Sequence, residues 1–282
     1  MNILSIQSWV AYGHVGNASA VFPLQRLGAE VWAVNTVQFS NHTGYGSWKG
    51  SVFSGQQIAE VVDGIELRGV LPKCDAVLSG YMGGADIGAT ILDAVARVKA
   101  ANPDAWYCCD PVIGDVGRGV FVRPGIPEFM AEHALPRADI VTPNQFELEH
   151  LTGMPSGTMA EAKAAVAALQ AKGPRVVLVT SLRTELTPED SIDMLAAEGG
   201  EFYLLRTPLL PLSVNGAGDA IAALFLFHRL RSGSVAEALE GAGSSVFGLL
   251  RRTAEAGSRE ILTVAAQDEF VSPSELFMAM PC

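Results

Sequence analysis

The chain has 282 residues, of which 49% are hydrophobic and 17% are charged, and its formal net charge is −11. This composition supplies ample material for a buried core and argues against a disordered chain. The negative charge argues against nucleic-acid and anionic-membrane partners, because both favour a basic protein surface. No apolar stretch approaches the roughly 18 residues that a membrane-spanning helix needs, so we expect no membrane association.

The opening segment lacks the basic region of a secretory signal, since the first Lys or Arg is Arg26. The four cysteines show no Cys-x-x-Cys spacing, and two of them, Cys108 and Cys109, are adjacent. Regularly spaced cysteines are typical of disulfide frameworks and metal sites, and this pattern resembles neither. We therefore expect a reduced, cytoplasmic protein.

Short β-branched or apolar runs alternate with longer helical patterns along the chain. The runs that predict strands cover residues 3–6, 31–37, 76–79, 106–109, 140–142 and 176–180. This alternation is typical of βαβ units, in which helices cover both faces of a largely parallel sheet. Residues 191–205 then form two strand-like runs around Gly199-Gly200, which predicts a hairpin and an antiparallel edge to the sheet. No composition break marks a linker, so we expect one domain over residues 1–282.

Two helix starts have the residues of a capping box. Thr158 with Glu161, and Ser234 with Glu237, each precede an alanine-rich apolar segment. Two glycine-rich segments, residues 41–50 and 113–119, interrupt the predicted elements. Such segments are either plain connections or mobile covers over a site.

The common nucleotide and hydrolase motifs are absent. The sequence contains no G-x-x-x-x-G-K-[ST] phosphate loop, and the glycines after the first predicted strand do not form G-x-G-x-x-G. None of the five histidines forms H-E-x-x-H, and no serine lies in G-x-S-x-G. A P-loop nucleotide site, a dinucleotide fold, a zincin and an α/β-hydrolase are therefore all poorly supported.

Carboxylates follow the predicted strands, where open α/β sheets bind ligands. Asp110 begins the stretch DPVIGD, which ends at Asp115, and Glu147 lies three residues after Asn144. Such acids can hold Mg²⁺, which needs only one or two protein oxygens besides substrate phosphates. The alternative is structural, because Asp before Pro favours a turn and Asn144 is a good helix cap.

The stretch SVNGAGDAIAALFLF at residues 213–227 places Gly216, Ala217 and Gly218 before Asp219 and a long apolar run. An acid in the first turn of a buried helix stabilises that helix, so Asp219 can act as a cap. Alternatively, the small residues expose helix amides to an anion such as a phosphoryl group, while Asp219 accepts a proton beside it. Together with the acids after the strands, this set suits phosphoryl transfer without a P-loop.

Six stretches together resemble the pyridoxal kinases of the ribokinase superfamily, and the similarity runs over essentially the whole chain. The stretches are SIQSWVAYGHVGN (5–17), NTVQFSNHTGYG (35–46), LSGYMG (78–83), DPVIGD (110–115), TPNQFELEHLTG (142–153) and NGAGD (215–219). The resemblance implies a ribokinase-like three-layer α/β/α fold, with a mostly parallel central sheet and an antiparallel edge. It also implies ATP-dependent phosphorylation of pyridoxal with Mg²⁺, and a homodimer.

The resemblance assigns roles to particular positions. Residues implied to bind the vitamin are Ser8, His42, Thr43, Gly44 and Tyr81. Residues implied to lie near ATP are Asp110, Asp115, Thr142, Glu147, Thr180 and Ser181, with Asp110 and Glu147 near Mg²⁺. Residues implied in the chemistry are Asp219, as the base, and Gly216, Ala217 and Gly218, as the anion hole. The segment from Thr207 to Asn215 is implied to border the adenine, and Arg118 is either a phosphate contact or a solvated loop charge.

Other functions stay open from the sequence. The nearest is a hydroxymethylpyrimidine or sugar kinase of the same superfamily, although a sugar site favours several polar side chains over a flat aromatic such as Tyr81. A non-catalytic protein that binds the vitamin would not need the acids Asp110, Glu147 and Asp219. A dehydrogenase would need the glycine fingerprint that the sequence lacks.

Overall fold

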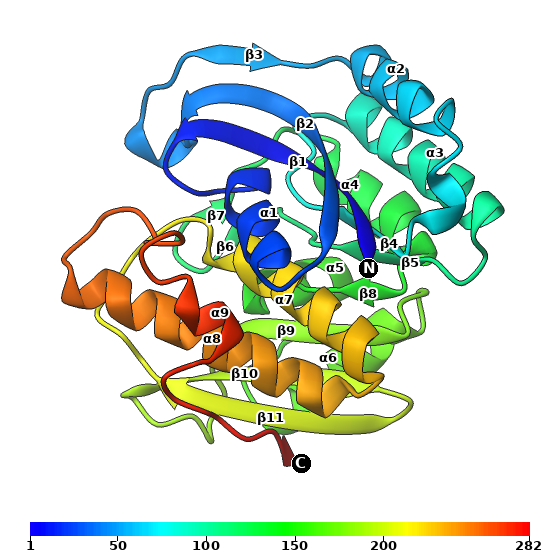
Figure 1. Cartoon of the computed structure of the whole chain (residues 1–282). Coiled ribbons are helices and arrows are strands. Elements are labelled where there is room, and N and C mark those ends of the chain that lie inside the picture. Colours follow the sequence, from blue (N-terminus) through cyan, green and yellow to red (C-terminus); the bar gives the residue numbers. More distant parts are fainter.

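The computed structural model describes residues 1–282 and contains one ten-stranded sheet (Figure 1). Its strands are β1 (Asn2–Tyr12), β2 (Glu30–Asn41), β3 (Gly50–Val52), β4 (Ala76–Ser79), β5 (Trp106–Cys109), β8 (Ile140–Val141), β9 (Val176–Leu182), β10 (Ser191–Glu198), β11 (Glu201–Pro208) and β12 (Met280–Pro281). Two further strands, β6 (Gly114–Asp115) and β7 (Gly119–Val120), pair only with each other.

The sheet order is β12-β11-β10-β9-β8-β5-β4-β1-β2-β3. The strands from β9 to β2 in this order pair parallel, whereas β3 at one end and β10, β11 and β12 at the other pair antiparallel. The strands β4, β5 and β8 are almost wholly buried, which explains why their sequences are continuous apolar runs and do not alternate. The predicted parallel sheet with an antiparallel edge is confirmed.

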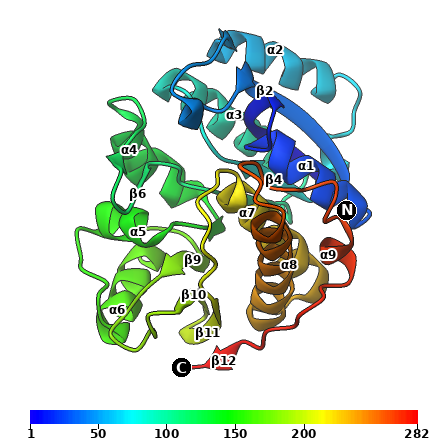
Figure 2. The same ribbon diagram turned by 90° about the vertical axis from the view of Figure 1, so that its left-hand side faces the viewer.

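Helices lie on both faces of the sheet, as Figure 2 shows with the sheet between two helical layers. The helices are α1 (Asn17–Arg26), α2 (Gly55–Glu66), α3 (Ala85–Ala101), α4 (Ile126–Phe129), α5 (Gln145–Thr152), α6 (Met159–Gln170), α7 (Ala217–Ser232), α8 (Val235–Glu255) and α9 (Asp268–Val271). One buried apolar cluster packs the helices from α2 through α6 against one face of the sheet. A second cluster packs α1, α7, α8 and α9 against the opposite face. The three-layer α/β/α arrangement is therefore also confirmed.

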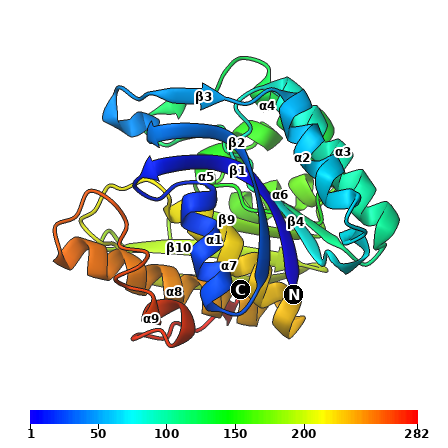
Figure 3. The same cartoon turned by 45° about the horizontal axis from the view of Figure 1, so that its top comes forward.

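The predicted strands differ most from the structure at β1 and β2. Apolar runs predicted strands over residues 3–6 and 31–37, yet β1 continues to Tyr12 and β2 to Asn41. Beyond Ile6 the two strands pair with each other past the end of β4, and Figure 3 shows them running beside β3. The extensions mix polar and apolar residues, with Gln7, Ser8 and Val10 buried and Ala11 and Tyr12 exposed, so no continuous apolar run marks them in the sequence.

The turn and cap predictions have mixed outcomes. Gly199 and Gly200, with φ of 61° and 87°, form the predicted hairpin turn between β10 and β11. The capping box at Thr158 is complete, whereas Ser234 accepts from the Glu237 amide without a return bond. The glycine-rich segment 113–119, which we expected to be a loop, forms the small hairpin of β6 and β7.

Short 3₁₀ turns cover Thr43–Tyr45, Leu71–Lys73 and Leu135–Arg137, and a π-helical turn covers Met130–Ala134. The first of these lies in the glycine-rich segment 41–50, between β2 and β3. None of the helices combines the length and apolarity that crossing a bilayer requires.

Candidate active site

The carboxyl ends of the parallel strands meet along one edge of the sheet, where doubly wound folds bind their ligands. Asp110 and Thr142 directly follow β5 and β8, Tyr81 lies two residues after the end of β4, and Thr180 lies near the end of β9. These strands are neighbours in the sheet, so residues that are far apart in the sequence are brought to the same edge. The carboxylates and hydroxyls that follow separate strands in the sequence therefore lie at one edge of the sheet.

Ser8 lies at an irregularity in the sheet. The pairing of β1 with β2 shifts register between Gln7 and Trp9, so Ser8 faces a bulge. The neighbouring Thr36 hydroxyl donates to the Tyr81 carbonyl oxygen at 3.2 Å, which ties β2 to the loop after β4. Gly16 packs so closely against Ser8 that any side chain there would collide with the Ser8 hydroxyl and carbonyl oxygens. Ser8 therefore lies in β1 beside the turn that contains Gly16, and Tyr81 lies after β4 in a loop joined to β2.

The start of α7 is pressed against the turn between β1 and α1. Gly216, with φ of 90°, is the residue before the helix, and a side chain at this position would collide with the His14 carbonyl oxygen. Ser19 donates to the Gly216 carbonyl oxygen at 2.8 Å. In contrast, no atom lies within 4 Å of where a Gly218 side chain would begin, and Gly218 is exposed. The first turn of α7 is thus fixed on one side and open on the other.

Asp219 projects from this first turn and is partly exposed. The amides of Gly16 and of Asp219 itself favour the ionised carboxylate, but burial has the larger effect and raises the pKa of Asp219 to about 6. The residue before the helix is Gly216, which has no side chain, so Asp219 does not act as an N-cap. It instead connects the α7 start to the turn after β1.

Asp110 is buried, with 6% of its surface exposed. Burial raises the pKa of Asp110 well above its usual range, and the nearby charges of Glu147 and Asp219 raise it further. Thr142 donates to Oδ1 of Asp110 at 2.9 Å, while Oδ2 has no partner in the chain. Asp110 therefore lies within electrostatic range of both Glu147 and Asp219.

Glu147 is held by backbone amides. Its Oε1 accepts from Ile113 at 2.8 Å and Gly114 at 3.3 Å, and its Oε2 accepts from Asn144 at 2.9 Å. Burial nevertheless raises the pKa of Glu147 to about 7, with these amides acting in the opposite direction. Asn144 accepts from the Glu147 amide at 2.9 Å, which confirms the capping alternative for Asn144. Glu147 therefore fixes the segment after β5 to the start of α5.

Mg²⁺ keeps several waters and needs few protein ligands, so a site need not contain a cluster of acids. No group of three or more His, Cys, Asp or Glu side chains surrounds a common point in this chain. The free Oδ2 of Asp110 is suited to such a cation, and a cation would offset the electrostatic repulsion among the three carboxyl groups. Both oxygens of Glu147 already accept amides, so Glu147 is suited to the outer sphere of the cation.

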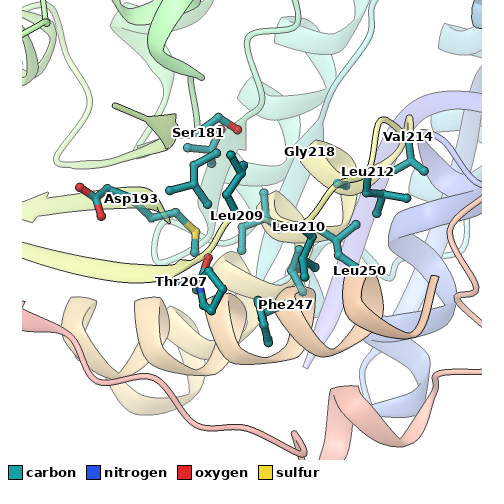
Figure 4. A pocket seen from close by; sticks show the side chains of 18 of the residues that line it. Ser181, Asp193, Thr207, Leu209, Leu210, Leu212, Val214, Gly218, Phe247 and Leu250 are labelled. Atoms are coloured by element: carbon teal, nitrogen blue, oxygen red, sulfur yellow. The ribbon is translucent and has the colours of Figure 1, made fainter. Parts of the chain in front are cut away.

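A cavity of about 320 Å³ begins at the first turn of α7 and runs between β10, β11 and α8 (Figure 4). Ala217 and Gly218 line one end, and Asp115, Thr180 and Ser181 lie along it. Its other end is apolar, with side chains that include Leu209, Leu210, Val246, Phe247 and Leu250. Ser181 has φ of 52°, the one non-glycine residue in the chain with a positive φ. Asp110, Thr142 and Glu147 are not part of the lining.

Residues 207–214 contribute much of this lining, including Thr207, Pro208 and Val214. The implied place of this segment beside an adenine therefore coincides with an actual cavity. Arg118 does not line the cavity. It is exposed, with its guanidinium 5.2 Å from the ring centre of Phe121.

Thr43 and Gly44 lie in the 3₁₀ turn that follows β2, and His42 is the residue just before this turn. A side chain on Gly44 would begin 2.9 Å from Nδ2 of Asn215, the residue before Gly216, so this turn reaches the start of α7. Thr43 is exposed, whereas His42 is nine-tenths buried and its Nε2 lies 2.9 Å from Oε1 of Glu260. The implied vitamin-binding turn therefore lies beside the start of α7, the helix that contains the implied base.

Glu260 was not among the residues predicted from the sequence. It lies 218 residues after His42 and belongs to no motif, so only a buried carboxylate in the folded chain identifies it. Glu260 Oε1 also accepts from the Tyr45 hydroxyl at 2.6 Å, and Oε2 accepts from the His14 amide at 3.3 Å. One side chain thus contacts the turn after β1 and the turn after β2.

A family model described as phosphomethylpyrimidine kinase matches residues 56–263, most of the chain. Among curated proteins, the pyridoxal kinase PdxY of Granulibacter bethesdensis is 69% identical, with 100% of both chains covered. The pyridoxal kinase PdxY of Deinococcus radiodurans is 60% identical, with 99% of this chain and 95% of that protein covered.

Solved structures give the same result for the fold. The pyridoxal kinase of Leishmania donovani, in complex with ADP and pyridoxamine, is 30% identical and superposes with a TM-score of 0.92 over 100% of this chain and 99% of that one. The pyridoxal kinase of Entamoeba histolytica, at 26% identity, superposes with a TM-score of 0.91. Full-length similarity to these enzymes, in sequence and in structure, shows that the chain belongs to the pyridoxal kinase family.

Proposed function

We propose that this protein transfers the γ-phosphoryl group of ATP to the 5′-hydroxymethyl oxygen of pyridoxal, giving pyridoxal 5′-phosphate and ADP. The observation that carries the proposal is the position of Asp219. Its carboxyl group lies between the open end of the cavity at Gly218 and the turn that contains Gly16 and adjoins Ser8. The names of the relatives and the bound ADP and vitamin forms of the Leishmania donovani enzyme support the same reaction.

The nucleotide occupies the cavity in this proposal. The adenine lies among the apolar side chains near Phe247 and Leu250, and the phosphates run past Thr180 and Ser181 toward the start of α7. The amides of Gly216, Ala217 and Gly218 then form the anion hole, because the first helix amides have no partner within the helix. The exposed surface at Gly218 leaves room for a phosphoryl group to approach.

The vitamin occupies the space at the ends of β1 and β4. Ser8 supplies a hydroxyl at the bulge, Tyr81 supplies a flat, partly buried ring, and His42, Thr43 and Gly44 cover the site. The proximity of Gly44 to Asn215 supports this arrangement, since it brings the cover next to the α7 start. The 5′-hydroxyl group then lies within reach of Asp219.

Asp219 acts as the base in this mechanism. A pKa raised to about 6 makes it a better proton acceptor than an ordinary aspartate, while leaving it ionised at neutral pH. If the transition state is loose, the hydroxyl proton becomes acidic as the new O–P bond forms, and Asp219 orients the oxygen and then receives the proton. Alignment and the helix amides provide most of the remaining rate enhancement.

We also propose that the reaction uses Mg²⁺, held by Asp110 directly and by Glu147 through its outer sphere. When bound, the cation neutralises charge on the phosphate oxygens. The residues of the chain position it: Thr142 fixes Oδ1 of Asp110, which leaves Oδ2 for the cation. Asp115 lies in the cavity lining and adds a further carboxylate near the phosphates.

A second candidate is phosphorylation of a hydroxymethylpyrimidine, since the matching family model has a phosphomethylpyrimidine kinase description. That match covers residues 56–263 and leaves out Ser8, His42 and Thr43. The residues proposed to recognise the vitamin thus lie largely outside the match, and the region inside contains the nucleotide cavity and Asp219. This distribution favours pyridoxal as the acceptor.

An assay of ADP formation across several acceptors tests the proposal. Pyridoxal, pyridoxine, pyridoxamine, a hydroxymethylpyrimidine and ribose are compared at equal enzyme and ATP. We expect kcat/KM for pyridoxal to exceed that for the pyrimidine by roughly 10²-fold or more, because polar groups of the site lose their hydrogen-bond partners when the pyrimidine is bound. Preference for the pyrimidine would identify the related kinase, and tight pyridoxal binding without turnover would identify a carrier.

Three further properties complete the proposal. We propose that residues 1–282 act as one domain, which is supported by the single continuous sheet. A reducing, cytoplasmic location is supported by four free cysteines, three of them buried. A homodimer rests on the family resemblance, and light scattering of the purified chain tests it.

A further inference from the structure

We propose that Glu260 is a positioning residue for the phosphoryl-acceptor site: its carboxylate clasps the turn 42–46 in the closed position and fixes the orientation and tautomer of His42. The inference rests on the proposed function of that turn as the cover of the vitamin site. Glu260 belongs to none of the motifs of the sequence and lies in the segment between α8 and α9. In Figure 1 this segment rises toward the ends of β1 and β2.

The clasp accounts for the attachment of the turn to the rest of the molecule. Thr43–Tyr45 form one 3₁₀ turn without a buried residue, so apolar packing does little to hold it. The hydrogen bonds that join residues 42–46 to a distant part of the chain are those from His42 and Tyr45, and both end on Oε1 of Glu260. Loss of this single carboxylate therefore removes both hydrogen bonds and leaves the turn with ring contacts, such as those of Tyr45 with Tyr12 and Arg259.

Glu260 itself is rigidly placed. Its carbonyl oxygen accepts from the Ser258 hydroxyl at 2.6 Å, and its amide donates back to the same hydroxyl at 3.2 Å. The Cα of Gly13 lies so close to Oε2 that a side chain at Gly13 would collide with it. Because Oε2 also accepts from the His14 amide, the carboxylate joins the turn 42–46 to the turn before α1.

The chemistry of the contact fixes His42. A carboxylate can only accept hydrogen bonds, so Nε2 of His42 must carry a hydrogen and donate it in the hydrogen bond to Glu260. In the neutral ring Nδ1 then has the lone pair, and this atom is buried and has no partner within the chain. It lies beside Gly44 and Asn215, at the boundary of the vitamin site. A ligand hydroxyl, such as the phenolic group of pyridoxal, is the donor that this lone pair lacks.

Tyr45 strengthens the clasp. Its hydroxyl donates to Glu260, and this hydrogen bond raises the pKa of Tyr45 to about 12, so the phenol keeps its proton. The ring lies 4.7 Å from the His42 ring, and the Arg259 guanidinium lies 4.8 Å from its centre. Tyr45 and His42 thus contact Glu260 side by side, with their rings tilted by 34° to each other.

Three variants separate the two parts of the inference. Glu260→Ala removes both contacts, and Tyr45→Phe removes the hydroxyl while the ring remains. Glu260→Gln keeps the shape, but its amide group can donate to Nε2 of His42 and so turn Nδ1 into a donor. The matched control is Glu255→Gln, an exposed glutamate of α8 whose contact with Arg251 is a long surface ion pair of 3.9 Å.

Two readouts are measured on each full-length variant. The first is the pair of KM values, for pyridoxal and for ATP. We expect KM for pyridoxal to rise about 10-fold or more in Glu260→Ala and Glu260→Gln, because a hydrogen bond to a charged or buried group is lost, with KM for ATP within about twofold. The second is the rate of trypsin cleavage after Lys49, an exposed residue of the same segment, which forms the fragment 1–49.

We expect cleavage after Lys49 to be at least about 10-fold faster in Glu260→Ala, intermediate in Tyr45→Phe, and unchanged in the control, because only the clasp variants open the segment locally. Equal rises in both KM values, or unchanged cleavage and unchanged pyridoxal KM in Glu260→Gln and Tyr45→Phe, would overturn the inference. Cleavage does not depend on turnover. Failure of the wild type to phosphorylate pyridoxal would therefore count against the proposed function and leave the clasp to be judged by proteolysis.

Discussion

The two glycine-rich segments of the chain are each held by one buried glutamate, but in different ways. Glu147 accepts the backbone amides of Ile113 and Gly114, so it fixes the main chain of the segment 113–119. Glu260 accepts from the side chains of Tyr45 and His42, so the turn 42–46 is attached through two rotatable groups. A backbone attachment gives a permanent wall, whereas a side-chain attachment can open and close, which a cover over a substrate requires.

Asp219 lies between these two regions, and its replacement gives the largest expected effect. Asp219→Asn keeps the shape but removes the proton acceptor, so we expect kcat to fall by roughly 10²- to 10⁴-fold while ATP binding is retained. Single-turnover phosphorylation and nucleotide titration measure the two quantities. Near-normal turnover in the variant would mean that Asp219 is not the proton acceptor of the reaction.

The glycines at the start of α7 provide the next test. Gly218→Ala adds a methyl group where nothing lies within 4 Å, so the fold tolerates it, but the methyl group occupies the approach to the anion hole. We expect kcat to fall by about 10- to 100-fold, because contacts to the phosphoryl group weaken, with Tm unchanged. Gly216→Ala is the contrasting variant, since φ of 90° and the His14 carbonyl oxygen make it destabilising. Normal activity of Gly218→Ala would exclude the amides from catalysis.

The pH dependence tests the base between the two segments. Burial raises the pKa of Asp219 to about 6, and the base must be ionised, so activity is present above this pH and is lost as pH falls through it. We expect kcat/KM for pyridoxal to fall about tenfold per pH unit below pH ~6. An acidic limb that stays flat to pH ~4, the usual aspartate range, would contradict the raised pKa.

Stability measurements compare the two attachments directly and give the smallest effects. Asn144→Ala removes the cap of α5 and the bond from Nδ2 to the Gly114 carbonyl oxygen, so we expect a loss of about 1–2 kcal/mol in the free energy of unfolding. Tyr45→Phe should change it by less than about 0.5 kcal/mol, because local opening of a turn does not limit global unfolding. Urea denaturation of both variants measures the difference. Equal losses of unfolding free energy in the two variants would mean that the turn 42–46 contributes as much to the stability of the fold as the segment held by Glu147.

Much of the fold could be predicted from local sequence. The apolar runs at residues 76–79 and 106–109 match β4 and β5, because a buried parallel strand needs every residue apolar. The ends of β1 and β2 were missed, since polar residues such as Gln7 and Gln38 interrupt the apolar runs while the two strands go on pairing with each other. The family resemblance, which depends on short motifs spread over the whole chain, is confirmed.

The sequence by itself determined the layers of the fold, the acids after the strands and the family, because strand burial and motif spacing are local properties. Only the tertiary structure decided that Asn144 and Glu147 form a cap and a wall, that residues 207–214 line a cavity, and that Glu260 meets a turn 218 residues earlier. Contacts between distant segments depend on how the chain returns to the same edge of the sheet, and no local pattern of residues encodes that return.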